Sequence, residues 1–193
     1  MKKNVLLIFA YPTHDNLNYA IYEQIKKGLE EGGHQIKILD LYAEKFDPVL
    51  IFNQEQRRRD IQHRPETKRY REQILWANHL VFIFPIWWGG MPAILKGYID
   101  KVFATGFAYH FEGVLPRGHL RGKTAWIITT DDTPAPVGFF MQDYGKVLKK
   151  QILSTMTGIK PTKHLKFTYV KGRKPETIKR WLAKCYQLGR NGL

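Results

Sequence analysis

The stretch Phe82–Phe103 constrains the fold most, because an apolar strand, a tight aromatic loop and an apolar helix follow one another in it. The residues before Pro85 are apolar without alternation, which is typical of a strand covered on both faces. Pro85 has no N–H and stops this strand, while Pro92 stands where a helix is expected to begin. Apolar residues at three- and four-residue steps then predict one buried helix face, made of Ile94, Leu95, Tyr98, Ile99, Val102 and Phe103.

The loop between this strand and this helix contains Trp87 and Trp88, followed by Gly89 and Gly90. Tryptophans in such a protein usually serve only as packing. Two of them ahead of two glycines, however, put large rings beside bare backbone at the carboxyl end of a strand. That combination suits a flat aromatic ligand.

The rest of the chain alternates strands with helices. Five such strands predict a doubly wound α/β fold with a parallel sheet and helices on both faces. Residues 10–18, after the first strand, contain no glycine, whereas a dinucleotide-binding Rossmann sheet carries G-x-G-x-x-G there. We therefore predict the flavodoxin-like strand order 2-1-3-4-5 in a single domain over residues 1–193. The other strands are expected over residues 5–9, 35–39, 124–130 and 163–169, and the other helices over residues 17–31, 66–77, 139–154 and 175–188.

Several details accompany this assignment. The helix over residues 66–77 is expected to turn Tyr70, Ile74 and Leu75 inward, and Gly189 is expected to end the last helix. Residues 106–122 and 131–138 are expected to be loops. Cys185 is the only cysteine, so an intrachain disulfide is excluded, and its place on an apolar helix face favours a packing role.

The charge is strongly positive and unevenly distributed. The net charge is +14, and residues 146–193 hold 13 Lys or Arg against one acid, Glu176. This basic segment favours a phosphorylated cofactor, a nucleic acid or an acidic membrane surface, unless it is only a solvated surface. No apolar run approaches the roughly 20 residues that span a bilayer, and the N-terminal run has no cleavage site. A cytoplasmic protein without a transmembrane segment is therefore expected.

Three loops are predicted to meet at the carboxyl edge of the sheet. The loop Tyr11–Asn18 leads into a helix N-terminus, which favours an anion such as a phosphate, although Asn16 could simply cap the helix. The loop Pro85–Gly90 offers aromatic rings, and the loop Thr129–Thr133 offers hydroxyls and backbone amides. A ring between the last two loops with a phosphate at the first describes a flavin mononucleotide.

Residues 85–103, reading PIWWGGMPAILKGYIDKVF, resemble the signature of the flavodoxin-2 family. This family comprises the NAD(P)H:quinone oxidoreductases, including DT-diaphorase-like enzymes and the ancillary flavoproteins of bacterial potassium-efflux systems. The segments 17–20, 106–109 and 126–130 extend the resemblance, which covers roughly residues 4–190. It implies FMN, or alternatively FAD, with NAD(P)H as the electron donor, a quinone-like acceptor, ping-pong kinetics and a homodimer. No metal and no nucleic-acid partner are expected.

The resemblance also implies roles for individual residues. The flavin phosphate would be held by Asn16, Leu17 and Asn18. The isoalloxazine ring would be held by Pro85, Ile86, Trp87, Trp88 and Gly89 on one side and by Thr129 and Thr130 at the other edge. The substrate pocket would be lined by Trp88, Tyr109 and Phe111, the last two reaching across the dimer interface. Beyond the resemblance, Tyr109 and His110 are the candidate catalytic residues: His110, beside Tyr109, would either protonate a reduced acceptor or be an ordinary surface histidine.

The chain departs from the diaphorase pattern after its fourth strand. Those enzymes have Thr-Thr-Gly-Gly where this chain has Thr-Thr-Asp131-Asp132, and their following tyrosine and histidine have no clear match here. Two alternatives to an enzyme therefore stay open. One is a regulatory or ancillary protein that binds a transporter or another partner, with a possible peripheral membrane contact, and the other is nucleic-acid binding through the basic segment.

Overall fold

The computed structural model describes residues 2–55, 57–134, 137 and 144–193. Its main sheet is parallel, with the strand order β2-β1-β3-β6-β7, so the predicted flavodoxin-like 2-1-3-4-5 order is confirmed. These strands are β1 (Asn4–Phe9), β2 (Gln35–Asp40), β3 (His79–Pro85), β6 (Thr124–Thr130) and β7 (Lys160–Phe167).

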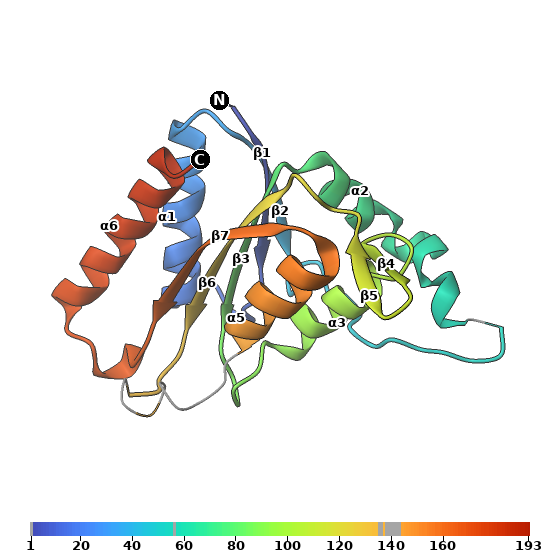
Figure 1. Ribbon diagram of the computed structural model, residues 1–193. Coiled ribbons are helices and arrows are strands. Elements are labelled where there is room, and N and C mark those ends of the chain that lie inside the picture. Colours follow the sequence, from blue (N-terminus) through green and yellow to red (C-terminus); the bar gives the residue numbers. More distant parts are fainter. Residues whose placement is uncertain (1, 56, 135–136, 138–143) are drawn as a thin grey trace.

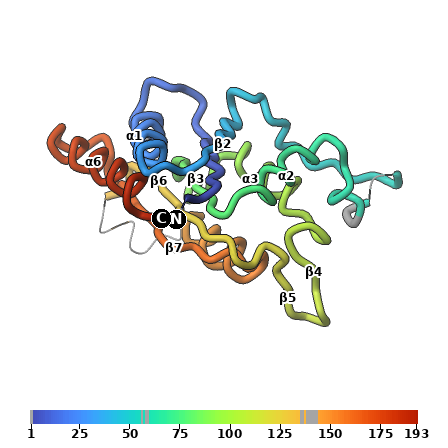
Figure 2. Tube along the Cα trace, turned by 90° about the horizontal axis from the view of Figure 1, so that it is seen from above, coloured from blue at the N-terminus to red at the C-terminus, as the bar shows by residue number. Residues whose placement is uncertain are grey.

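Helices cover both faces of this sheet (Figure 1). One face carries α1 and α6, which lie side by side in Figure 1 and in the view from above in Figure 2. The other face carries α2, α3 and the helical segment that begins with α5. The helices are α1 (Leu17–Glu31), α2 (Lys68–Trp76), α3 (Ala93–Val102), α5 (Tyr144–Val147), the π-helical η3 (Leu148–Thr157) and α6 (Pro175–Asn191), with short 3₁₀ turns η1 (Arg58–His63), η2 (Pro65–Thr67) and η4 (Val170–Gly172).

The continuous apolar runs of the strands follow from this two-sided cover. Successive side chains of a strand point to opposite faces, so a strand covered on both sides must be apolar throughout. In β1, Val5 and Leu7 enter the cluster beneath α1 and α6, while Leu6 and Ile8 enter the cluster beneath α2 and α3. All six apolar residues predicted for the face of α3 are buried.

Three details of the prediction are wrong. Leu75 points outward, with 59% of its surface exposed. Gly189 does not end α6 but lies inside it, because a Cβ there would stand 2.5 Å from the Ile25 carbonyl oxygen, so a glycine lets α6 approach α1 closely. The last strand ends at Phe167 rather than at Tyr169, which has a left-handed φ of 55° and precedes η4.

The connection expected over residues 106–122 contains a two-stranded hairpin, β4 (Tyr109–Glu112) and β5 (Leu115–Gly118). Its turn includes Gly113 with a φ of +59°, which a glycine adopts without strain. Two further predictions fall partly on positions 135, 136 and 138–143, outside the described residues: the loop 131–138 and the start of the helix 139–154. No helix in the described ranges has the length and apolarity needed to cross a bilayer.

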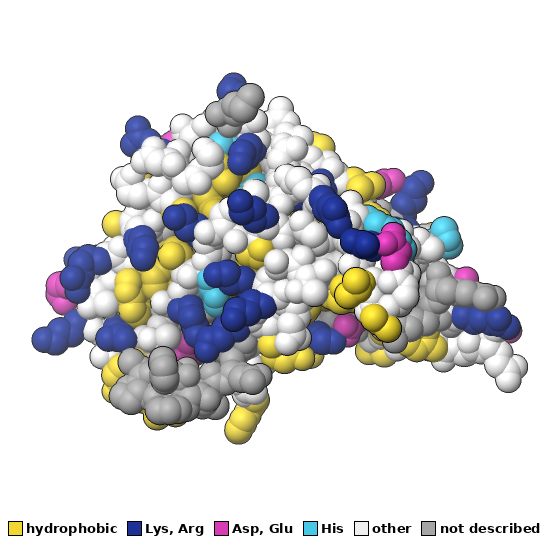
Figure 3. All heavy atoms as spheres, in the orientation of Figure 1, with side chains coloured by type: hydrophobic (Ala, Val, Ile, Leu, Met, Phe, Trp, Pro, Cys, Tyr) yellow, Lys and Arg dark blue, Asp and Glu magenta, His cyan; other side chains and the backbone are white. Residues whose placement is uncertain are grey.

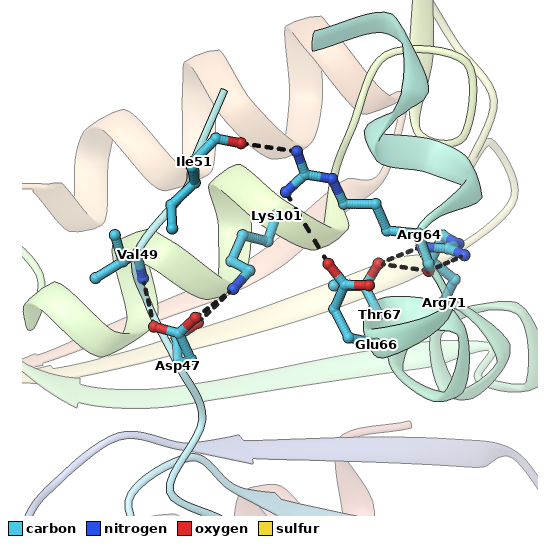
Figure 4. A network of polar contacts seen from close by, with 8 residues as sticks. All are labelled: Asp47, Val49, Ile51, Arg64, Glu66, Thr67, Arg71 and Lys101. Carbon is cyan, nitrogen blue, oxygen red and sulfur yellow. Dashed lines mark hydrogen bonds and ion pairs between the residues drawn. The ribbon is translucent and has the colours of Figure 1, made fainter. Parts of the chain in front are cut away.

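Polar contacts fasten the irregular segment between β2 and α2 to the helices beside it (Figure 4). The buried ammonium of Lys101 in α3 donates to the backbone oxygen of Asp47 at 3.0 Å and to its carboxylate at 2.9 Å. This hydrogen bond lowers the pKa of the Asp47 carboxyl below its ordinary value. Arg64 donates to the Ile51 carbonyl at 2.7 Å, and Arg71 in α2 donates to the Arg64 carbonyl at 3.0 Å.

Candidate functional site

A cavity of about 770 Å³ opens at the carboxyl edge of the main sheet. The loops that follow β1, β3, β6 and β7 meet there, because the carboxyl ends of parallel strands share one edge. Its volume lies within the range of small-molecule and cofactor sites. The cavity is lined by Tyr11, Asn16, Leu17, Asn18, Pro85, Ile86, Trp87, Trp88, Thr130, Asp131, Asp132, Thr133, Pro134, Val170 and Lys171.

The N-terminus of α1 forms one wall. Asn16 caps the helix, since its Oδ1 accepts a hydrogen bond from the Tyr19 amide at 3.1 Å and its Nδ2 donates to the Thr13 carbonyl at 2.6 Å. The backbone amides of Leu17 and Asn18 have no acceptor in the part of the chain that the structure describes. Together with the positive end of the helix dipole, these two amides are suited to bind an anion.

A buried hydrogen bond joins the start of α1 to the end of β6. The hydroxyl of Thr130 donates to the Asn18 Oδ1 at 2.9 Å, and the two residues are 4% and 6% exposed. Strand β3 lies between β1 and β6, so this bond closes the floor of the cavity across the end of β3. It fixes the loop after β1 and the loop after β6 relative to each other.

The tryptophan pair lies in a tight turn closed by two backbone hydrogen bonds. The Trp87 amide donates to the Gly90 carbonyl at 2.9 Å, and the Gly90 amide donates to the Trp87 carbonyl at 2.8 Å. The two central residues, Trp88 and Gly89, have φ values of +52° and +71°. A bulky residue with such a φ is strained, and the Trp88 side chain is fully exposed. Packing within the chain therefore does not explain why tryptophan occupies this position.

Most residues that the resemblance implied for a flavin line this one cavity, namely Asn16, Leu17, Asn18, Pro85, Ile86, Trp87, Trp88 and Thr130. Two others do not line it. Thr129 is fully buried, with its hydroxyl 3.3 Å from the His164 Nε2, because neighbouring residues of β6 face opposite sides of the sheet. Gly89 lies in the turn but is not part of the wall.

Of the four residues assigned to the acceptor, Trp88 lines this cavity, whereas Tyr109, His110 and Phe111 do not reach it in a single chain. Tyr109 lines a second cavity of about 310 Å³ beside α3 and η3. Phe111 is half exposed on the hairpin. The His110 Nδ1 lies 2.6 Å from the Nε2 of His119, so these two imidazoles share a hydrogen bond.

Residues 131–133 and 170–171 form a set of contacts that we call the aspartate clasp. The Val170 amide donates to the Asp131 carbonyl at 3.2 Å, and the Lys171 amide donates to the Asp132 Oδ1 at 2.9 Å. The Lys171 ammonium lies 3.3 Å from the Asp132 Oδ2. The sequence did not lead us to expect Val170 and Lys171 at this cavity. The loop after β7 nevertheless belongs at this edge, because β7 was predicted to lie beside β6.

The basic character of the protein is not concentrated in the cavity. Figure 3 shows Lys and Arg side chains gathered on the face around β7, with few acidic ones among them. Among the residues that line the cavity, the charged ones are Asp131, Asp132 and Lys171. Within the described residues, no group of three or more His, Cys, Asp or Glu side chains is placed to hold a metal ion.

Residues 3–188 match a family model described as a flavodoxin-like fold, Flavodoxin_2. The chain is 36% identical over 121 residues to an uncharacterized NAD(P)H oxidoreductase of Escherichia coli, YcaK, covering 62% of each protein. It is 30% identical over 151 residues to NAD(P)H dehydrogenase [quinone] 1 of Cavia porcellus, covering 66% of this chain and 53% of that protein. The chain thus spans between about half and three fifths of these relatives.

A solved structure resembles the whole chain more closely. The crystal structure of Smu.1420 from Streptococcus mutans UA159 is 46% identical, covers 97% of this chain and 99% of its own, and superposes with a TM-score of 0.90. The likeness to this structure includes the strands and loops that form the cavity, because it extends over nearly the full chain.

Proposed function

This chain belongs to the Flavodoxin_2 family, and we propose that it is a flavin-dependent NAD(P)H oxidoreductase that reduces quinone-like acceptors. The proposal of NAD(P)H as donor is supported by the relatives named NAD(P)H oxidoreductase and NAD(P)H dehydrogenase [quinone]. The proposal of a quinone acceptor is supported by the second of these. We further propose that residues 1–193 act as a single domain.

The residues of the cavity fit a flavin mononucleotide. The amides of Leu17 and Asn18 are donors for a phosphate, and the indole of Trp87 provides an apolar surface beside a ring. A flavin bound there supplies two-electron chemistry, taking a hydride equivalent from NAD(P)H and passing it to the acceptor. We propose FMN rather than FAD as the flavin, because the two free amides at the start of α1 offer a site for a single phosphate group.

The chain's own residues bind and orient the flavin. The hydrogen bond between Thr130 and Asn18 holds the two loops at a fixed spacing, and the turn at Trp88 carries an indole at the mouth of the cavity. An indole there shields a bound ring from water and offers a stacking surface. Donor and acceptor would occupy the same open side of the cavity in turn, which predicts ping-pong kinetics.

One observation carries the proposal: the free amides of α1, the tryptophan turn and the end of β6 line a single cavity. Its test is a titration of the purified protein with FMN and, separately, with FAD, followed by flavin fluorescence and visible absorption. We expect saturable binding of one FMN per chain, weakened by Trp87→Ala and unaffected by Leu75→Ala, which removes an exposed apolar side chain away from the cavity. Absence of binding by either flavin contradicts the proposal.

We also propose that the protein acts as a homodimer through the β4–β5 hairpin. Phe111, Val114 and Leu115 are exposed there at 53%, 88% and 59%, which is unusual for three apolar neighbours on a monomer. A dimer would bring the hairpin of one chain toward a cavity of its partner. Light scattering of the protein and of Val114→Asp tests this, and a monomeric parent protein contradicts it.

A further inference from the structure

We propose that the protein docks on anionic lipid membranes through a basic face formed by β7, α6 and the segment between them. The purpose of this docking, access to an acceptor dissolved in lipid, rests on the proposed function, whereas the contact with lipid itself requires no flavin. We define the basic face by six exposed side chains, namely Lys163, Arg173, Lys174, Lys179, Arg180 and Lys184.

The positive charge of the chain is concentrated in one region. Residues 146–193 hold 13 Lys or Arg against a single acid, Glu176, whereas residues 1–145 hold 18 Lys or Arg against 16 acids. Nearly all of the net charge of +14 therefore comes from the region that runs from η3 through β7 to α6. A surface with charge of one sign attracts a polyanion and raises the rate of encounter with it.

The fold places these charges along one edge of the main sheet. β7 is the edge strand. Lys163 points to the side of α6, because Leu165, two residues further along β7, packs in the cluster beneath α1 and α6. Arg180 and Lys184 are four residues apart and so lie on the same side of α6. Figure 3 shows Lys and Arg side chains over both elements in a single view, in the orientation of Figure 1.

The segment between β7 and α6 continues this face. The Trp181 ring of α6 lies 4.9 Å from the Phe167 ring of β7, which joins the two elements. The Arg173 guanidinium lies 5.6 Å from the Trp181 ring, so it stands over the junction. The basic face is therefore one continuous surface made of a strand, a short connection and a helix.

The cations of the basic face are available for a partner. Among the described residues, none of the six side chains forms an ion pair with an acid. Glu176 is the single acid of this part of the chain. Asp132, at the neighbouring wall of the cavity, lies 3.3 Å from the ammonium of Lys171. Little negative charge from the chain itself thus neutralises this face.

An anionic lipid surface suits the basic face better than a nucleic acid does. Single-stranded nucleic acids stack their bases on exposed aromatic rings, but Arg173 stands over both the Tyr169 ring and the Trp181 ring, at 5.8 and 5.6 Å. Four of the six side chains are lysines, which act as point charges and lack the planar fork of arginine. Each Lys or Arg close to an anionic membrane strengthens binding to it.

The basic face adjoins the 770 Å³ cavity. The turn η4 joins β7 to Arg173, and two of its residues, Val170 and Lys171, line the cavity. Docking through the basic face therefore brings the cavity close to the lipid, where an apolar quinone-like acceptor dissolves. The apolar side of α6 is packed against the sheet, so the contact is electrostatic and reversible by salt.

The test measures co-sedimentation of the purified full chain with vesicles, without added flavin. Vesicles of phosphatidylcholine alone are compared with vesicles of phosphatidylcholine and phosphatidylserine in equal parts, at low and at high salt. The test variant is Lys163→Gln/Arg180→Gln/Lys184→Gln, which removes three charges of the basic face. Circular dichroism verifies that it is folded, and Lys184→Gln alone is a second variant.

The matched control is Lys37→Gln/Lys45→Gln/Lys68→Gln. It removes three exposed cations at the opposite side of the molecule, on the edge strand β2, in the turn after it and on α2. The control and the test variant have the same net charge. A difference between them therefore reports the place of the charges and not their number.

We expect the parent protein to sediment with the phosphatidylserine vesicles at low salt and to be released at high salt. Removal of each charge should weaken binding about fivefold, so the test variant should bind on the order of 100-fold more weakly. The control variant should bind like the parent protein. Absence of binding by the parent protein, or an equal loss in both triple variants, overturns the inference.

Two further outcomes separate this inference from its alternatives. Binding of a labelled oligonucleotide that persists at the salt concentration that releases the vesicles overturns the inference in favour of a nucleic acid. A protein that binds FMN but not vesicles leaves the proposed function standing and overturns the inference. A protein that binds vesicles through the basic face but takes up no flavin supports the docking and overturns the proposed function alone.

Discussion

Replacing Trp88 by asparagine is expected to stabilise the protein and at the same time to weaken its binding of flavin. The Trp88 side chain is fully exposed, so it contributes almost no burial to folding, yet its backbone has a left-handed φ of +52°. That conformation costs roughly 1–2 kcal/mol for an ordinary residue, and asparagine tolerates it much better. We therefore expect Trp88→Asn to raise the free energy of unfolding by about 1 kcal/mol, or the Tm by about 2–4 °C for a chain of this size.

The same substitution removes a stacking surface at the mouth of the cavity. One aromatic ring stacked on a base contributes about 1–3 kcal/mol, so FMN should bind roughly 5- to 150-fold more weakly. Thermal unfolding of the flavin-free protein and FMN titration measure the two effects separately.

Lys45→Asn is the matched control for this experiment. Lys45 is exposed, has a φ of +50° and lies away from the cavity, so its replacement should raise stability without changing FMN affinity. A loss of stability in Trp88→Asn would refute the reasoning, because the indole would then be packed against another part of the protein. Unchanged FMN affinity would also refute it, because the indole would then not contact the flavin.

Three further results are expected. Thr130→Val should lower the free energy of unfolding by about 1–3 kcal/mol in urea titrations, because it leaves the buried Asn18 oxygen without its donor; an unchanged midpoint would contradict this. Burial lowers the pKa of His79 to about 3, so the unfolded chain alone takes up that proton below pH 6.5. Stability should therefore fall by up to about 1.4 kcal/mol per pH unit as pH drops from 6.5 toward 3, and the slope should be smaller in His79→Gln. Burial also raises the pKa of the Cys185 thiol to about 12, so a thiol reagent at pH 8 should label it only after denaturation; rapid labelling of the folded protein would contradict the assigned packing.

The strands of the main sheet were predictable because their evidence is local, and their order followed from the absence of glycine in residues 10–18. Apolar runs without alternation identify strands covered on both faces, and β6 over Thr124–Thr130 and α1 over Leu17–Glu31 have the predicted bounds. The hairpin β4–β5 was missed, since its strands are short, partly exposed and carry little apolar alternation. Gly189 was misread because a glycine that ends a helix and a glycine that lets two helices touch look alike in sequence.

The cavity was predictable to the extent that its residues directly follow strands. Asn18 and Thr130 are 112 positions apart, yet each lies at a strand end or helix start that the topology brings to one edge. It was harder to predict to which face of the sheet a side chain points, as the burial of Thr129 shows. The contacts of Lys171 with Asp132 depend on the pairing of two loops that are far apart in the sequence, and no local sequence pattern indicates such a pairing.

The central claim is that this cavity holds a flavin that exchanges electrons with NAD(P)H. Its most direct test is anaerobic absorption spectroscopy of the protein loaded with FMN. We predict that one equivalent of NADH or NADPH bleaches the bound flavin and that one equivalent of menadione restores its absorption. A bound flavin that stays oxidised with both donors, or a protein that retains no flavin, would contradict the account.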